Sequence, residues 1–223
     1  MQTFLQRFFF KKLARHLRRP AGWFGEKVGR KMNAANAFLY DTTLDIMQPG
    51  NNDRILEIGF GNGKFFDKIF TKAHDLQLTG IDFSEKMLRE AQKNNTDSIV
   101  SGKLKLHYGS SDNLPFPDNH FDKVFCINVV YFWDPPLPHL QEIHRVLKPG
   151  GHFYSVIRSR KSIEQMPFSN YGFIKYEQDE WLTILTGCRY KAAGIKVIKE
   201  PEAKLKGKSY PVESWCFVAK KES

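Results

Sequence analysis

The chain has 223 residues, of which 41% are hydrophobic and 26% are charged. This composition is typical of a soluble globular protein, and the length suits one domain of about 150–200 residues with an extension. The three cysteines, Cys126, Cys188 and Cys216, are too far apart for a zinc-ligand pattern, and their odd number argues against a disulfide framework. We therefore expect no metal site, and reduced, buried thiols in a cytoplasmic protein.

The net charge of +10 is concentrated at the N-terminus. Residues 1–31 contain nine lysines and arginines against one acid, Glu26, and so carry +8 of the total. Apolar residues recur between these charges at helical spacing: Phe4, Leu5, Phe8, Phe9, Leu13 and Leu17. We expect residues 1–48 to form a basic helical extension ahead of a main domain over 49–223. The apolar face of the extension either packs on the domain or lies peripherally on an anionic membrane, and nucleic acid is the least favoured partner.

The same segment lacks the features of a signal peptide and of a membrane span. Charges follow the short apolar run Phe8–Phe10, and no cleavage site of small residues is present. No stretch reaches the roughly 18 apolar residues that a transmembrane helix needs.

Along the chain, Pro20 ends the first predicted helix, and the glycine-rich stretch 21–29 predicts a turn. A second helix is expected over 32–47, and strands and helices then alternate. The predicted strands are 54–59, 76–81, 104–108, 123–127, 151–158, 196–199 and 214–220, and the predicted helices are 64–72, 84–94, 137–147 and 178–192. This alternation predicts a Rossmann-like α/β fold, doubly wound, with a seven-stranded and mostly parallel sheet. The last two strands have no helix between them and should form an antiparallel hairpin.

The stretch ILEIGFGNGKF, residues 55–65, places Gly59, Gly61 and Gly63 directly after the first predicted strand. Dinucleotides bind to a similar turn, G-x-G-x-x-G, but the last position of that pattern is Lys64 here. A nucleotide-binding oxidoreductase of the NAD type is therefore a disfavoured alternative. The chain also lacks the G-x-x-x-x-G-K-[ST] pattern of a P-loop.

An acidic residue, Asp82, ends the second predicted strand, 21 residues beyond Gly61. A carboxylate at this place can accept hydrogen bonds from both hydroxyls of a ribose. Its alternative role is to cap the following helix, although Ser84 suits that role better. Two further segments join the glycine loop and Asp82 in this set of motifs and surround the third, fourth and fifth predicted strands: HYGSSDNLPFPDNHFDKVFCIN and RVLKPGGHFYSV.

In this order and spacing, residues 50–160 resemble the class I S-adenosylmethionine-dependent methyltransferases, especially the small-molecule branch that includes the quinone-biosynthesis C-methyltransferases. The resemblance implies S-adenosylmethionine as the cofactor and a small-molecule or lipid-like methyl acceptor. It also implies an N-terminal lid over the acceptor. The residues that it places around the cofactor are Glu57, Gly59, Phe60, Gly61, Gly63, Asp82, Phe83, Ser110, Ser111 and Asn128.

Within that set, the resemblance assigns Glu57 to the ammonium of the cofactor, Asp82 to the ribose hydroxyls and Phe83 to the adenine. Ser110 stands where the family often has an aspartate for the adenine amino group, so its hydroxyl offers a weaker contact. A backbone contact from Ser111 is expected in its place.

Three aromatic residues after the fourth predicted strand, Tyr131, Phe132 and Trp133, either wall the acceptor pocket or pack beneath the next loop. Their run departs from the Asn-Pro-Pro-Tyr signature of adenine-methylating relatives, which argues against that reaction. His139 and His144 do not share a helix face and are expected at the surface or in packing roles. No catalytic base can be named, and a catalytically silent cofactor-binding protein is the remaining alternative.

Overall fold

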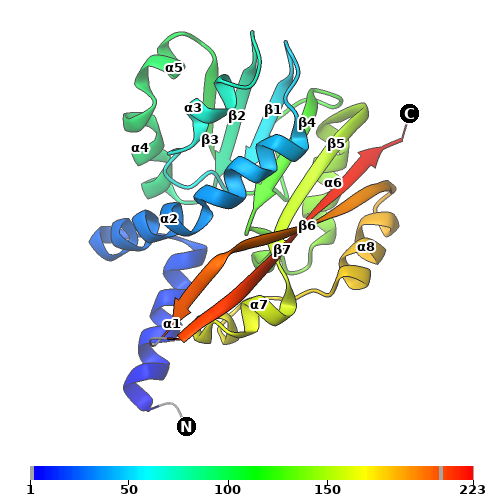
Figure 1. The fold of residues 1–223 in the computed structure, drawn as a ribbon. Helices are drawn as coiled ribbons and strands as arrows, with labels where there is room; N and C mark the ends of the chain where they lie inside the picture. Colours follow the sequence, from blue (N-terminus) through cyan, green and yellow to red (C-terminus); the bar gives the residue numbers. More distant parts are fainter. Residues whose placement is uncertain (1–2, 206–207, 223) are drawn as a thin grey trace.

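The computed structural model describes residues 3–205 and 208–222 and contains one seven-stranded sheet with helices on both faces (Figure 1). The strand order is β3-β2-β1-β4-β5-β7-β6. Strands β1 to β5 pair in parallel, and β7 pairs antiparallel with β5 and β6. The strands are β1 Arg54–Ile58, β2 Gln77–Asp82, β3 Leu104–Tyr108, β4 Phe121–Ile127, β5 Leu147–Arg158, β6 Tyr190–Leu205 and β7 Lys208–Lys221. The predicted Rossmann-like sheet and its C-terminal hairpin are confirmed.

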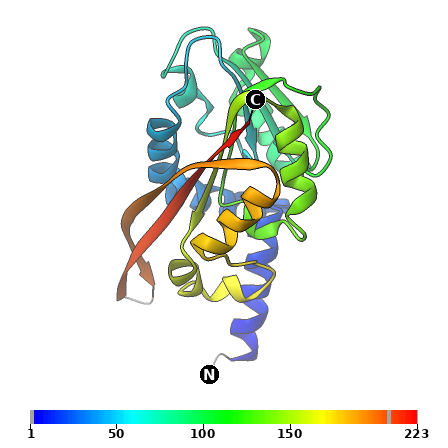
Figure 2. The same cartoon turned by 90° about the vertical axis from the view of Figure 1, so that its right-hand side faces the viewer.

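Helices cover the sheet on both sides, as the two views show (Figures 1 and 2). The α-helices are α1 Phe4–Arg18, α2 Gly22–Met47, α3 Phe66–Phe70, α4 Glu85–Asn94, α5 Thr96–Val100, α6 Leu137–Val146, α7 Arg160–Glu164 and α8 Gln178–Gly187. Two short 3-10 helices, η1 Val130–Phe132 and η2 Pro167–Asn170, follow β4 and α7.

The predicted turn over residues 21–29 is wrong, because α2 starts at Gly22 and runs through this stretch. A glycine inside a helix costs about 1 kcal/mol relative to alanine, which is why the sequence favoured a turn. The structure explains one of these glycines by close packing. A Cβ atom on Gly25 would lie 2.9 Å from the carbonyl carbon of Pro20, so glycine lets the chain between α1 and α2 fold back on the helix.

The two C-terminal strands are longer than predicted, and α8 ends earlier than expected. Arg189 has a φ of 64°, which breaks the helix just before β6 begins at Tyr190. Lysine and glutamate residues interrupt the apolar pattern of β6, which lies at the edge of the sheet, and Lys191, Lys196 and Lys199 are exposed there. The backbone pairing with β7 extends through these polar positions, where the side-chain pattern carries no strand signal.

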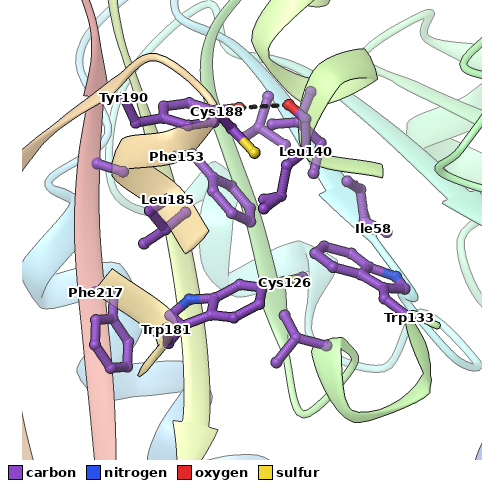
Figure 3. Close-up of a cluster of buried hydrophobic side chains, with 14 of the residues drawn as sticks. Ile58, Cys126, Trp133, Leu140, Phe153, Trp181, Leu185, Cys188, Tyr190 and Phe217 are labelled. Carbon is purple, nitrogen blue, oxygen red and sulfur yellow. Dashed lines mark hydrogen bonds between the residues drawn. The ribbon is translucent and has the colours of Figure 1, made fainter. Parts of the chain in front are cut away.

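Two apolar cores enclose the sheet because successive side chains of a strand point to opposite faces. Ile55 packs in the cluster that contains residues of α2, α3 and α4, while its neighbour Leu56 packs in the cluster with α6 and α8. Figure 3 shows part of the second cluster, in which Trp181 is fully buried. The indole nitrogen of Trp181 donates a hydrogen bond of 2.8 Å to Ser155 Oγ.

We expect Trp181→Ala to lower the free energy of unfolding by about 3–5 kcal/mol, because the substitution leaves a large cavity and an unpaired hydroxyl. Chemical denaturation followed by circular dichroism measures the loss. Leu137→Ala is the matched control, since Leu137 is half exposed on α6, and its loss should be about 0.5 kcal/mol. Equal losses for the two variants would contradict this account of the core.

Candidate functional site

A cavity of about 270 Å³ lies at the carboxyl ends of β1, β2 and β4, where α2 and the chain between α1 and α2 close over the sheet. This edge is where open α/β sheets bind their ligands. The structure brings most of the predicted site residues together in the lining of this cavity: Glu57, Gly59, Phe60, Gly61, Asp82, Phe83, Ser110, Ser111, Asn128 and Trp133. Gly63 and Tyr131 do not belong to the lining.

The three glycines after β1 all have positive φ angles, of 74° at Gly59, 60° at Gly61 and 66° at Gly63, but they have different surroundings. A Cβ atom on Gly59 would lie 2.6 Å from the side chain of Val129, and one on Gly63 would meet Phe66 at the same distance. Gly61 has open space in the direction of a Cβ atom. Gly61 therefore faces the space of the cavity, whereas Gly63 allows the loop to pack on its neighbours.

Glu57 is buried, with 5% of its surface exposed, and it accepts a hydrogen bond of 2.6 Å from the hydroxyl of Tyr40 on α2. Burial raises the pKa of Glu57 to about 8, although the Tyr40 hydrogen bond lowers it. The carboxyl group therefore holds its proton at neutral pH in the ligand-free protein, and a cation nearby would favour its ionised form.

Asp82 is also buried, and both of its carboxylate oxygens accept backbone hydrogen bonds. Oδ2 accepts from Gly61 N at 3.0 Å, and Oδ1 accepts from Ser84 N at 2.8 Å. Burial raises the pKa of Asp82 to about 6, while these two hydrogen bonds lower it. Ser84 caps α4, since its Oγ accepts from Met87 N, as the sequence predicted. The Asp82 carboxylate thus fastens the glycine loop to the end of β2.

The long helix α2 contributes polar residues that the sequence analysis missed. Asn33 Nδ2 donates to Asn62 Oδ1 at 3.1 Å, and Asn36 Oδ1 accepts from Asn128 Nδ2 at 3.1 Å. With Tyr40, these residues follow an i, i+3, i+7 spacing along one helix face. That spacing was a signal in the sequence, but nothing in the sequence showed what these residues faced.

In the lining of the cavity, Ser111 and His139 form a side-chain pair, with 2.8 Å between Ser111 Oγ and His139 Nδ1. The imidazole stacks on Trp133 with 4.9 Å between ring centroids. Burial lowers the pKa of His139, so the ring is neutral at neutral pH. His139 was expected in a surface or packing role, and the structure instead makes it part of the cavity lining.

The aromatic run after β4 is divided between two roles. Phe132 and Trp133 line the cavity, and Trp133 also belongs to the core in Figure 3. Tyr131 lies behind them, where its hydroxyl donates to Asn128 Oδ1 at 3.0 Å and accepts from Arg158 N at 2.5 Å. Tyr131 therefore supports Asn128, which has a left-handed φ of 59°, and of the two roles that the sequence left open it does not have that of a cavity wall.

The charge of the lining favours a cationic ligand over a phosphate ester. Among the described residues that line the cavity, Arg18 is the one lysine or arginine, and the acids are Glu57, Asp82, Asp112 and Asp134. A pyrophosphate would need cations or free backbone N–H groups, but the N–H of Gly61 is already bound to Asp82. S-adenosylmethionine fits this set because it carries an ammonium and a sulfonium, a ribose diol and no phosphate.

Comparison with known proteins agrees with this geometry. A methyltransferase domain model matches residues 56–155. An uncharacterized methyltransferase of Bacillus subtilis, YdaC, is 31% identical over 60% of this chain and 72% of its own length. The ubiquinone/menaquinone biosynthesis C-methyltransferase UbiE of Rickettsia bellii is 37% identical, and the match spans 44% of that protein. A solved S-adenosylmethionine-dependent methyltransferase of Methanosarcina mazei has the same fold, with a TM-score of 0.60, 22% identity and coverage of 76% of this chain and 92% of that one.

The chain belongs to the class I S-adenosylmethionine-dependent methyltransferase family, and S-adenosylmethionine is its cofactor. Within the described residues, no helix is both long enough and apolar enough to span a membrane.

We expect Gly61→Val to weaken the binding of S-adenosylhomocysteine by at least about 100-fold, because a branched side chain would enter the space of the cavity. Gly102→Val is a matched control, since Gly102 also has a positive φ, of 76°, and open space around a Cβ atom, but lies outside the cavity lining. Both variants should lose about 1–2 kcal/mol of stability from the left-handed backbone. Calorimetric titration that finds normal affinity in a folded Gly61→Val protein would disprove the role of the loop.

Proposed function

We propose that this methyltransferase transfers the methyl group of S-adenosylmethionine to a small, lipid-like acceptor, and that the cavity holds both molecules. The cofactor supplies a methyl group on a sulfonium, which an incoming nucleophile displaces. The protein's task in such a displacement is to align the acceptor with the methyl group and to exclude water.

The proposed cofactor site uses the carboxylate-lined half of the cavity. Asp82 accepts hydrogen bonds from the ribose hydroxyls, and Glu57, in its ionised form, pairs with the ammonium. Phe83 and the backbone of Ser111 contact the adenine. Burial supports both carboxylate roles, because charged hydrogen bonds are strong where water is excluded. Asn128, which α2 and Tyr131 hold in place, lies beside the cofactor.

The proposed acceptor site uses the aromatic half of the cavity, between Phe132 and Trp133 on the sheet side and Leu17 and Met32 on the helical side. These walls suit an apolar, planar acceptor such as a quinol, which has the chemistry that the name of the relative UbiE indicates. The observation that carries the proposal is that aromatic side chains and buried carboxylates line one and the same cavity. An NAD-type oxidoreductase is not favoured, and neither is a silent binding protein.

The basic extension, residues 1–48, is proposed to act as the lid of this site and as a peripheral contact with an anionic membrane. Helix α1 extends away from the sheet, with the N-terminus at its far end (Figures 1 and 2). Phe4 is 83% exposed and Phe8 is 64% exposed, so the domain does not cover this apolar face. Six lysines and arginines and no acid accompany it over residues 1–19. Each cation near an anionic surface adds about 1 kcal/mol to binding.

A cytoplasmic location of the protein remains a prediction from the sequence.

The proposed function predicts label transfer from methyl-labelled S-adenosylmethionine to a quinol lacking one methyl group, with a faster rate in anionic than in zwitterionic vesicles. Extraction and chromatography of the lipid phase measure the product. Asp82→Asn, which loses the proposed ribose acceptor, is the inactive control. A protein that binds S-adenosylhomocysteine but labels neither quinols nor other small apolar acceptors would contradict the choice of acceptor. Equal rates in both kinds of vesicle, even in low salt, would contradict the membrane contact.

The proposed role of Glu57 predicts a pH-dependent affinity. Its raised pKa, about 8, means that the carboxyl group must lose a proton to pair with the ammonium. Binding of S-adenosylhomocysteine should therefore strengthen as pH rises from 6 to 7.5, by up to about tenfold per pH unit, and release a proton. Calorimetry in two buffers of different ionisation enthalpy counts that proton. Glu57→Gln keeps an acceptor for Tyr40 and should flatten the dependence, and an unchanged slope in this variant would disprove the assignment.

A further inference from the structure

The end of α1 and the chain that follows it line the cofactor cavity. We call residues 17–20, the last two of α1 and the next two, the strap. Leu17, Arg18 and Pro20 all line the cavity, although they lie far from the other lining residues in the sequence. A ligand seated between the ends of β2 and β3 would therefore lie beneath the strap.

Two hydrogen bonds from adjacent residues fasten the strap beside the proposed adenosine site. The carbonyl oxygen of Pro20 accepts a hydrogen bond of 2.8 Å from the buried Oγ of Ser84, the cap of α4. Arg19 Nη2 donates to the hydroxyl of Tyr108, the last residue of β3, at 3.1 Å. The Arg19 guanidinium also lies over the ring of Phe83, 5.7 Å from its centroid. Arg19 thus bridges the turn after β2 and the end of β3.

The fastening by Arg19 is weak enough to be reversible. Its hydrogen bond to Tyr108 is exposed to solvent, and an exposed cation–π contact contributes about 0.5–1 kcal/mol. Helix α1, to which the strap belongs, rests mainly on α2 and η2, and Ala14 is its one buried residue among those described. Little apolar surface therefore opposes a movement of α1 away from the domain.

We infer that Arg19 is a positioning residue that latches the strap over the adenosine end of the bound cofactor, and that S-adenosylhomocysteine leaves after the strap lifts. The inference rests on the placement of the adenosine between Asp82, Phe83 and Ser111 under the proposed function. It assigns to Arg19 control over the lifetime of the complex, without direct contact with the methyl group. In this arrangement, the movement that releases the product also uncovers the neighbouring acceptor half of the cavity.

The latch is tested by the dissociation rate of S-adenosylhomocysteine. Stopped-flow displacement with the whole chain measures this rate. Arg19→Ala should raise this rate by about fivefold, which corresponds to the loss of one exposed cation–π contact and one hydrogen bond. Tyr108→Phe, which removes only the hydroxyl, should raise it less. Arg15→Ala is the matched control, because it removes the same charge from an exposed position of α1 outside the cavity lining and should leave the rate unchanged.

Asp82→Asn separates failure of the latch from failure of the proposed site. If Asp82→Asn weakens binding but Arg19→Ala and Arg15→Ala release the ligand at the same rate, the latch is disproved and the cofactor site stands. If Asp82→Asn binds as tightly as the wild type, the placement of the adenosine is wrong and the latch falls with it. Equal circular dichroism spectra and thermal midpoints for the Arg19 and Arg15 variants establish that a faster release does not come from unfolding.

Discussion

The buried carboxylate of Asp82 is the constraint on which the geometry of the site depends. It accepts hydrogen bonds from Gly61 N in the loop after β1 and from Ser84 N at the start of α4, so one side chain joins two loops that start from neighbouring strands. A buried carboxylate without such donors would be strongly destabilising, and a glycine loop without an anchor would be mobile. Each therefore stabilises the other, and the space above Gly61 stays open for a ligand.

The N-terminal extension contributes residues to the lining of the cavity. Helix α2 places Tyr40 against Glu57, Asn36 against Asn128 and Asn33 against Asn62, so three hydrogen bonds tie it to the ends of β1 and β4. These bonds cross the boundary expected at residue 48. The methyltransferase domain model matches from residue 56 onward, so these helical residues lie outside it.

Negative and positive charges lie on different surfaces of the protein. The cavity lining is acidic, with Arg18 as its one lysine or arginine among the described residues, while the exposed face of α1 is basic. An acidic lining attracts a cationic cofactor, and under the proposed membrane contact the basic helix attracts an anionic surface. Since α1 and the strap are continuous, the proposed surface contact and the lining of the cavity involve the same segment.

The sequence by itself determined the order of the seven strands and of the helices other than the short α5 and α7, the loop at Gly59–Gly63, the acid at the end of β2 and Ser84 as the cap of α4, because each depends on local periodicity or on backbone demands of neighbouring residues. Only the tertiary structure decided which partners these residues meet. Pro20 packs where a Cβ atom on Gly25 would lie, Tyr131 supports Asn128 while Trp133 faces the cavity, and His139 reaches Ser111 from α6. Ser111 and His139 are 28 residues apart, and the two shorter-range contacts depend on how the chain turns after α1 and after β4, so no helix or strand periodicity in the sequence encodes them.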